Sequence, residues 1–167
     1  PTQTPNLTNV VALASGDYHS LALKQDGTVW SWGDNQTGEL GDGTFANRIT
    51  PAQVSGLTDI ISISTGGWHN MALKNDGTVW VWGYNYYGQL ATGDTVNLNI
   101  PTQVAGLTNI IAIAAGDYHS VALKSDGTVW AWGDNNNGEL GDGTFISRKT
   151  PVQVSGLTDI ISISTGG

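Results

Sequence analysis

The residues of this chain with the greatest chemical potential are three histidines, His19, His69 and His119, spaced 50 residues apart. Beside the first lie Asp17 and Ser20, whose carboxylate and hydroxyl groups are the types found in a Ser-His-Asp triad. Adjacent residues of an extended strand point to opposite faces, however, so this spacing does not place the imidazole between the other two groups. We therefore expect no catalytic residue, and predict structural histidines that bond to neighbouring loop backbone.

A second candidate is the oxygen-rich loop at 34–39, DNQTGE, with its counterpart DNNNGE at 134–139. Carboxylate and amide oxygens suit Ca²⁺, but the alternating ligands of an EF-hand loop are missing. Asn, Asp and Gly also form turns without any ion. In the corresponding segment 84–89 both acids are replaced, by Tyr84 and Gln89. We therefore predict turns here, with neither a metal nor a cofactor.

The same replaced segment, beginning YNYYGQ, gives the strongest indication of a binding site. Tyr84, Tyr86 and Tyr87 would present rigid, amphipathic contact area, as tyrosines do in antibody paratopes. Trp68 replaces Tyr18 of the first unit and would extend this patch if the loops share a face. Packing between repeats and drift without selection remain the alternatives to binding.

These residues belong to a repeat with a period of 50. Segments starting at residues 1, 51, 101 and 151 align without gaps, giving three full units and the first 17 residues of a fourth. The first unit resembles the third more than the second, which indicates internal duplication with a superperiod of 100. Each full unit carries a WxWG sequence, and its tryptophans are Trp30, Trp32, Trp80, Trp82, Trp130 and Trp132.

Each unit is expected to contain a β-hairpin, formed in the first unit by residues 20–24 and 29–32. A two-residue type I′ turn at Asp26-Gly27 would pair Leu23 with Trp30 and Leu21 with Trp32. One face of the sheet would then be bulky and the other mostly small. The bulky face of one unit would pack against the small face of the next, so that stacked units share a continuous core.

Two further strands complete each unit. A Ser- and Ala-rich strand such as 60–64 precedes the hairpin, and a short strand such as 51–54 follows a long polar loop. Four short strands per unit without helical periodicity predict an all-β fold of β-propeller blades, each of four antiparallel strands. The predicted blades span 9–54, 59–104 and 109–154, with a partial outer strand at 1–4 and a partial inner strand at 159–164.

The repeat resembles the regulator-of-chromosome-condensation repeat. The resemblance is carried by GDYHS at 16–20, by the following LALKQDGTVWSWGDN and by GELGDGT at 38–44, and it recurs in all three units. It implies a seven-bladed propeller, of which this chain would form part, and a role as a binding platform. Guanine-nucleotide exchange on a small GTPase is the best-known activity of the family. The DGTVWxWG form also resembles bacterial secreted or cell-surface members, which favours that location.

Composition limits the partners. With 14 acidic against 6 basic residues the formal net charge is −8, which disfavours nucleic acid, and no apolar run is long enough to span a membrane. We therefore expect a non-catalytic interaction scaffold with an unidentified protein partner. The alternatives are an exchange factor for a small GTPase and a self-assembling structural repeat protein. Three blades cannot close a ring, so we expect self-association or continuation in a longer chain.

Overall fold

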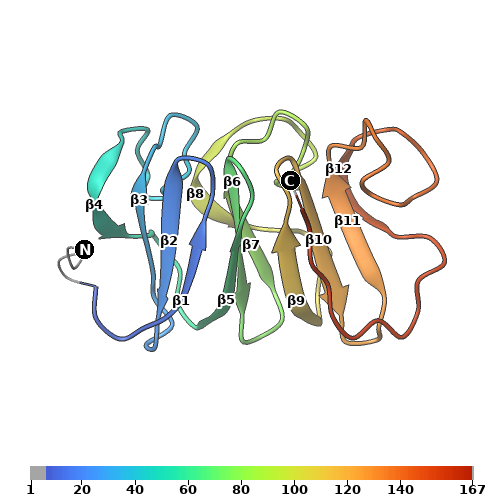
Figure 1. The fold of residues 1–167 in the computed structure, drawn as a ribbon, viewed down its shortest axis with the longest axis horizontal. Coiled ribbons are helices and arrows are strands. Elements are labelled where there is room, and N and C mark those ends of the chain that lie inside the picture. The colour runs from blue at the N-terminus through green and yellow to red at the C-terminus, as the bar shows by residue number, and fades with distance from the viewer. Residues whose placement is uncertain (1–6, 167) are drawn as a thin grey trace.

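The computed structural model describes residues 7–166, and these form twelve β-strands and no helix (Figure 1). The strands build three four-stranded antiparallel sheets, each ordered as its strands follow one another in the chain. The predicted all-β fold of four-stranded blades is confirmed. The first blade comprises β1 (Val10–Ser15), β2 (His19–Lys24), β3 (Val29–Gly33) and β4 (Arg48–Gln53). The second comprises β5 (Ile60–Thr65), β6 (His69–Lys74), β7 (Val79–Gly83) and β8 (Leu98–Gln103). The third comprises β9 (Ile110–Ala115), β10 (His119–Lys124), β11 (Val129–Gly133) and β12 (Arg148–Gln153).

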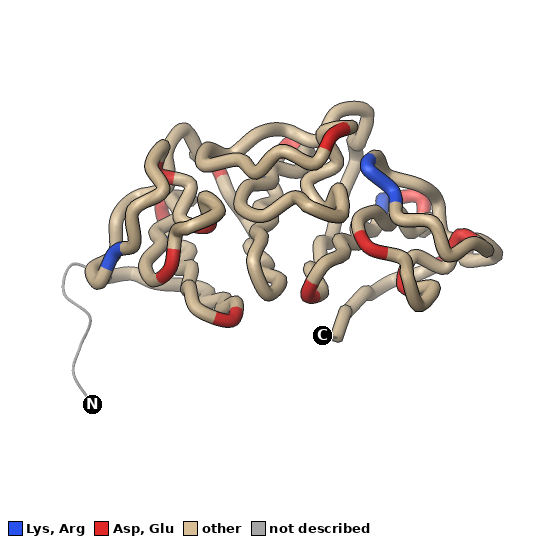
Figure 2. Tube along the Cα trace, turned by 90° about the horizontal axis from the view of Figure 1, so that it is seen from above, with Lys and Arg blue, Asp and Glu red and all other residues tan. Residues whose placement is uncertain are grey.

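The three blades fan out along an arc, as the view from above shows (Figure 2). Their first strands, β1, β5 and β9, lie where the blades meet: each contacts the first strand of a neighbouring blade, β5 also contacts β2, and β9 also contacts β6. Small residues permit this approach, because a Cβ atom on Gly66 would lie 2.1 Å from the carbonyl oxygen of Gly116. The connections after β1, β5 and β9 are therefore glycine-rich at the point where the blades converge.

The turn of each hairpin differs from the prediction. In the first blade the amide of Lys24 bonds to the carbonyl of Thr28, which leaves a three-residue loop, Gln25-Asp26-Gly27. Only Gly27, with φ of +77°, adopts the left-handed conformation, whereas a type I′ turn requires positive φ at both central residues. The Asp26 side chain instead accepts hydrogen bonds from the backbone and hydroxyl of Thr28.

The extra loop residue shifts the strand register by one, so the predicted pairs were wrong. Trp30 lies opposite Ala22, and Trp32 lies opposite Ser20. The tryptophans thus share a face with small residues, and the opposite face carries leucine, valine and small residues, among them Leu21 and Leu23. Neighbouring blades still pack face to face as expected, but the Ala-Trp face of one blade meets the Leu-Val face of the blade before it.

The two ends of the chain were also expected to form strands. The segment 1–4 lies outside the described residues. Residues 159–164 are not assigned to a strand, and the described residues contain no hairpin that pairs with them.

A backbone carbonyl, which we call the anchor carbonyl, joins each pair of blades. Between the first two blades it belongs to Glu39, and it accepts hydrogen bonds from Trp82 Nε1 at 2.9 Å and Asn70 Nδ2 at 2.8 Å. The Oδ1 atom of Asn70 in turn accepts a bond of 2.7 Å from His19 Nε2. One buried chain of bonds therefore links both blades through polar groups that would be costly to leave unpaired.

The second junction, between the second and third blades, repeats this arrangement with a serine, Ser120, in the place of Asn70. The anchor carbonyl of Gln89 accepts bonds from Trp132 Nε1 at 2.8 Å and Ser120 Oγ at 3.0 Å. His69 Nε2 lies 2.9 Å from Ser120 Oγ, and because that hydroxyl already donates its proton, the imidazole is the donor. His19 and His69 thus bond to a side chain of the following blade and not to loop backbone, which differs from the prediction.

Removing an indole from a junction should strongly destabilise the chain. Trp132 is fully buried and both packs in the core and donates to its anchor carbonyl. We expect Trp132→Ala to lower the free energy of unfolding by about 3–5 kcal/mol, measured by urea denaturation. Ile49→Ala, at a side chain that is 99% exposed, is the control and should change it by less than about 0.5 kcal/mol. Equal losses for both variants would contradict this account of the junction.

The buried histidines should make stability depend on pH. Burial, together with His119 and His19, lowers the pKa of His69 to about 3, whereas the unfolded chain has a pKa near 6.5. Between these values only the unfolded state binds the proton, so the free energy of unfolding should fall as the pH falls. For this one histidine the slope is about 1.4 kcal/mol per pH unit. Urea denaturation at pH 7 and at pH 5 measures it.

His69→Gln is the matched variant for this measurement, and it should show a shallower decline over the same range. Burial also lowers the pKa values of His19 and His119, so some dependence should remain in the variant. A wild-type stability that is constant between pH 6.5 and 5 would contradict the neutral, buried imidazole.

Candidate functional site

The antiparallel order of each blade places two kinds of connection at the same end. The short turns after β1, β5 and β9 and the long loops after β3, β7 and β11 all lie there, while the hairpin turns lie at the opposite end (Figure 1). Trp68 is in one of the short turns, and Tyr84, Tyr86 and Tyr87 are in the long loop of the second blade. The fold therefore brings the four predicted binding residues to one end of the molecule.

Six aromatic rings gather there. Tyr84 stacks on Tyr86 with ring centroids 6.3 Å apart, and the Tyr86 ring meets Tyr87 edge-on at 5.1 Å. Both Tyr84 and Tyr87 also contact Tyr118 of the third blade, at 6.3 and 5.3 Å. Trp68 packs edge-on against Tyr18 of the first blade at 5.4 Å. We call this set the aromatic surface: Tyr18, Trp68, Tyr84, Tyr86, Tyr87 and Tyr118.

The two groups of rings are joined across the second blade. A cavity of about 270 Å³ is lined by Thr37, Trp68, Tyr84 and Tyr118, one or two residues from each blade. Tyr18 and Tyr86 are the most open rings, with exposed fractions of 67% and 65%, and the other four are half-buried. Burial among neighbouring tyrosines raises the pKa of Tyr84, so its hydroxyl stays protonated at neutral pH. The aromatic surface therefore consists of two groups of rings that border one cavity, extends over all three blades and is partly open to solvent.

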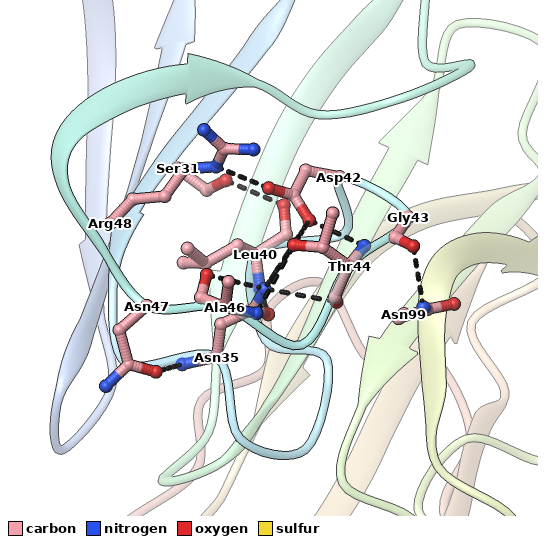
Figure 3. Close-up of polar contacts among 10 residues, drawn as sticks. All are labelled: Ser31, Asn35, Leu40, Asp42, Gly43, Thr44, Ala46, Asn47, Arg48 and Asn99. Atoms are coloured by element: carbon pink, nitrogen blue, oxygen red, sulfur yellow. Dashed lines mark hydrogen bonds and ion pairs between the residues drawn. The ribbon is translucent and has the colours of Figure 1, made fainter.

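The long loops that carry these rings are held by their own hydrogen bonds. In the first blade Asn35 is fully buried, and its side-chain oxygen accepts from the amide of Leu40 at 2.8 Å (Figure 3). Its amide nitrogen donates to the carbonyls of Thr44 and Ala46, both at 3.1 Å. Asp42 caps the amide of Thr44 and forms an ion pair with Arg48. The side-chain oxygens of Asn35 and Glu39, which were considered above as cation ligands, thus accept hydrogen bonds from the loop's own amides of Leu40 and Thr37.

The tyrosine-bearing loop of the second blade keeps the same internal hydrogen bonds, although its outward side chains differ. Asn85 takes the place of Asn35 and makes the corresponding bonds to Leu90 and Val96. Ala91, where the other loops have glycine, keeps a left-handed φ of +56°. Since these hydrogen bonds are preserved, the tyrosine substitutions alter what the loop presents to solvent and leave its path unchanged.

The end that carries the aromatic surface is also acidic. Nine of the 14 acidic residues lie in its connections, and acidic positions are spread over all three blades (Figure 2). They are Asp17, Asp34, Glu39, Asp42, Asp94, Asp117, Asp134, Glu139 and Asp142. Three of them, Asp117, Asp134 and Glu139, line a cavity of about 580 Å³ together with Tyr87, Tyr118 and His119. Carboxylates and tyrosine rings therefore face the same space.

The structure separates the other predicted residues from this surface. His19 and His69 are buried in the blade junctions, and only His119 reaches the large cavity. Trp82 and Trp132 are buried in the core, while Trp30, Trp80 and Trp130 are half-buried, each beneath a lysine ammonium. Trp32 is half-buried on the open side of the first blade.

Sequence reasoning missed two members of the aromatic surface, Tyr18 and Tyr118. They occupy the repeat position of Trp68, and this shared position was the signal that could have identified them. Within residues 7–166, no group of three or more His, Asp or Glu side chains is arranged to hold a metal ion. The described part of the chain likewise contains no helix that could cross a membrane.

Solved structures share this architecture. Human WBSCR16 superposes with a TM-score of 0.86 at 27% sequence identity, covering 99% of this chain and 45% of that one. Prp20p from Saccharomyces cerevisiae, whose structure is reported with its binding properties to Gsp1p and histones, gives the same score and identity, covering 99% and 44%. The chain thus spans less than half the length of either protein.

Short stretches of the sequence are similar to curated proteins. Human E3 ubiquitin-protein ligase HERC2 is 51% identical over 35 residues, which is 21% of this chain and 1% of that protein. Protein pim1 of Schizosaccharomyces pombe is 46% identical over 43 residues, which is 26% of this chain and 8% of that protein. The RCC1-like domain matches residues 1–167, the whole length of the sequence. Together with the three-bladed fold, this match shows that the chain belongs to the RCC1-like domain family.

Proposed function

We propose that the aromatic surface is the binding site of a protein-interaction scaffold. Propeller domains of this family are in general binding or exchange-factor domains, and the chain has their fold. The observation that carries the proposal is the gathering of six rings from all three blades at one end of the molecule, of which Tyr18 and Tyr86 are about two-thirds exposed. Tyrosine and tryptophan are enriched in interface hot spots because they bury much area with little loss of side-chain freedom.

The charge around the rings indicates the chemistry of the partner. Asp117, Asp134 and Glu139 lie beside Tyr87 and Tyr118 in one cavity. Carboxylates attract a cationic side chain, and the face of an aromatic ring stabilises one that is partly desolvated. The partner segment we propose therefore carries Arg or Lys next to apolar residues. Histones, named with Prp20p, are basic proteins, and a partner of this kind fits the same chemistry.

Guanine-nucleotide exchange on a small GTPase is the second candidate function. The relation to Prp20p, a protein reported with its binding to Gsp1p, favours it. Exchange would require the partner to release nucleotide on binding, whereas a scaffold would leave the nucleotide in place. A fluorescent-nucleotide release assay on a small GTPase distinguishes the two functions.

The aromatic surface can be tested with the combined variant Tyr84→Ala, Tyr86→Ala and Tyr87→Ala. The probe is a peptide array in which Arg and Lys, apolar residues, and Asp and Glu are varied systematically. We expect the wild type to bind peptides that combine a basic with an apolar residue, and the variant to bind them at least about tenfold more weakly. The melting temperature of the variant should stay within about 2 °C of the wild type.

The single variant Tyr86→Phe retains the ring and should retain most of the binding. Ile61→Ala, at an exposed side chain near the start of β5 and so at the hairpin-turn end of the second blade, is the matched control and should bind as the wild type does. A large fall in melting temperature for the triple variant with unchanged peptide binding would instead make the tyrosines packing residues between blades.

A further inference from the structure

The cavity of about 270 Å³ between the two groups of rings has mostly aromatic walls. It is lined by Trp68, Tyr84 and Tyr118, and Thr37 completes the lining. The ring planes of Tyr84 and Tyr118 are inclined at 64°, so these two rings form adjacent walls that meet at a corner. Trp68 pairs with Tyr18 and forms no ring pair with either tyrosine of the lining, so the cavity separates it from them. Three aromatic side chains therefore surround one space.

This cavity lies in the middle of the arc of blades. Thr37 belongs to the long loop of the first blade, and Gly38 beside it packs on β8, where an added Cβ would lie 2.6 Å from the carbonyl oxygen of Leu98. Tyr118 belongs to the third blade and contacts Tyr84 of the second. The cavity is therefore bounded by residues from both neighbours of the second blade, and it takes no wall from the outward face of the first or third blade.

The rings are held in place by contacts made before any ligand enters. Tyr84 stacks on Tyr86 with planes 12° apart and meets Tyr118 edge-on. Trp68 packs edge-on against Tyr18 at 5.4 Å. The three lining rings are half-buried, so part of each remains open to a ligand. Side chains that are already ordered lose little conformational freedom on binding, which favours affinity.

Negative charge lies around the cavity but not on its walls. Among the described residues, neither a carboxylate nor a basic side chain lines it. The amide and hydroxyl of Thr37 both donate to the carboxylate of Glu39, which is 1% exposed. Beside Trp68, a Cβ atom on Gly67 would lie 3.4 Å from a carboxylate oxygen of Asp17. A cation in the cavity would be attracted by these charges without finding a carboxylate at the wall to accept its N–H groups.

This combination favours a cation that has no N–H groups. The ammonium of an unmodified lysine has three donors, and these lose their water partners on entering a cavity walled by rings. A trimethylated lysine keeps the positive charge, has no donor to satisfy and presents methyl groups to the ring faces. The volume is below the roughly 300–1,000 Å³ of sites for drug-sized ligands, so it suits the end of one side chain.

The second unit differs from the other two at the residues that form these walls. Asp34 and Asp134 occupy the repeat position of Tyr84. A carboxylate at this position would accept hydrogen bonds from an unmodified lysine, and the tyrosine replaces it with a ring. Trp68 likewise stands where the other two units have tyrosine, and indole is the aromatic group that binds cations most strongly. Both substitutions therefore favour a methylated cation.

We propose that this cavity binds the trimethylated ammonium of a lysine in the partner protein. The proposal rests on the proposed function, because this lysine belongs to the basic and apolar segment inferred above. The open rings of Tyr18 and Tyr86, which pair with Trp68 and Tyr84, would contact apolar residues beside that lysine. A protein segment can use these flanking rings, whereas a free quaternary ammonium such as choline cannot.

Titration with single amino acids tests the cavity separately from the scaffold function. The probes are the N-acetyl methylamides of trimethyl-lysine, of lysine and of the neutral isostere in which a quaternary carbon replaces the trimethylated nitrogen. We expect trimethyl-lysine to shift the indole signal of Trp68 in ¹⁵N-edited spectra and to bind at least about fivefold more tightly than either other probe. The isostere isolates the effect of the charge, and lysine isolates that of the N–H donors.

Two substitutions restore residues that the other units carry at the same positions, so the loops should keep their fold. Tyr84→Asp should remove most of the preference for trimethyl-lysine over lysine, and Trp68→Tyr should weaken trimethyl-lysine binding. Ile61→Ala, at the hairpin-turn end, is the control and should bind as the wild type does. Equal binding of trimethyl-lysine and either other probe would overturn the proposal, as would a preference that Tyr84→Asp leaves intact.

A peptide titration separates this proposal from the proposed function. The probes are choline and the capped peptide Gly-Leu-Lys-Leu-Gly with its lysine either trimethylated or unmodified. We expect the trimethylated peptide to bind at least about tenfold more tightly than choline, because its leucines contact the flanking rings. Peptides that bind equally with and without methylation would overturn the cavity's selectivity and leave the proposed function standing. A trimethylated peptide that binds no more tightly than choline would overturn the assignment to a protein lysine.

Discussion

The hydrogen bond from an indole to the anchor carbonyl of the preceding blade is the interaction on which the rest of this structure depends. Each sheet has an apolar face that no single blade can cover, so the blades are stable only when stacked. Hydrophobic packing alone leaves the angle and depth of that stacking free. The bonds from Trp82 to Glu39 and from Trp132 to Gln89 fix both, because a buried donor displaced from its carbonyl would lose a partner.

The hydrogen bonds that fix the blade junctions are made only by buried groups. The histidines, their Asn or Ser intermediaries and the indoles are enclosed at the junctions, and the long loops are held by a buried asparagine. The outward side chains of these loops take no part in the buried hydrogen bonds of the junctions. A loop such as 84–97 can therefore carry tyrosines where the first loop has Asp34, Gln36 and Thr37, while Asn85 preserves its path. The fold separates the residues that define the scaffold from those that determine what it binds.

Most of the fold that could be predicted from the sequence was predicted from the repeat. Its period, the small residues of the inner strands and the apolar residues of each hairpin indicated four-stranded blades, which the structure confirms. The register was wrong because Asp26-Gly27 occurs both in two-residue turns and at the end of three-residue turns, and the dipeptide alone does not distinguish them. The anchor carbonyls could not be predicted, since a backbone oxygen leaves no mark on residue type. Tyr18 and Tyr118 were missed because their contacts with Trp68, Tyr84 and Tyr87 arise only when blades are placed side by side.

Exchange of the indole protons with solvent deuterium, resolved residue by residue in ¹⁵N-edited spectra, tests the central claim most directly. Trp82 and Trp132 donate to buried carbonyls, whereas the indole of Trp32 has no hydrogen-bond partner among residues 7–166. At low protein concentration, we expect the indole protons of Trp82 and Trp132 to exchange only with opening of the blades, and that of Trp32 to exchange much faster. Equal exchange rates for all three indoles would contradict the account.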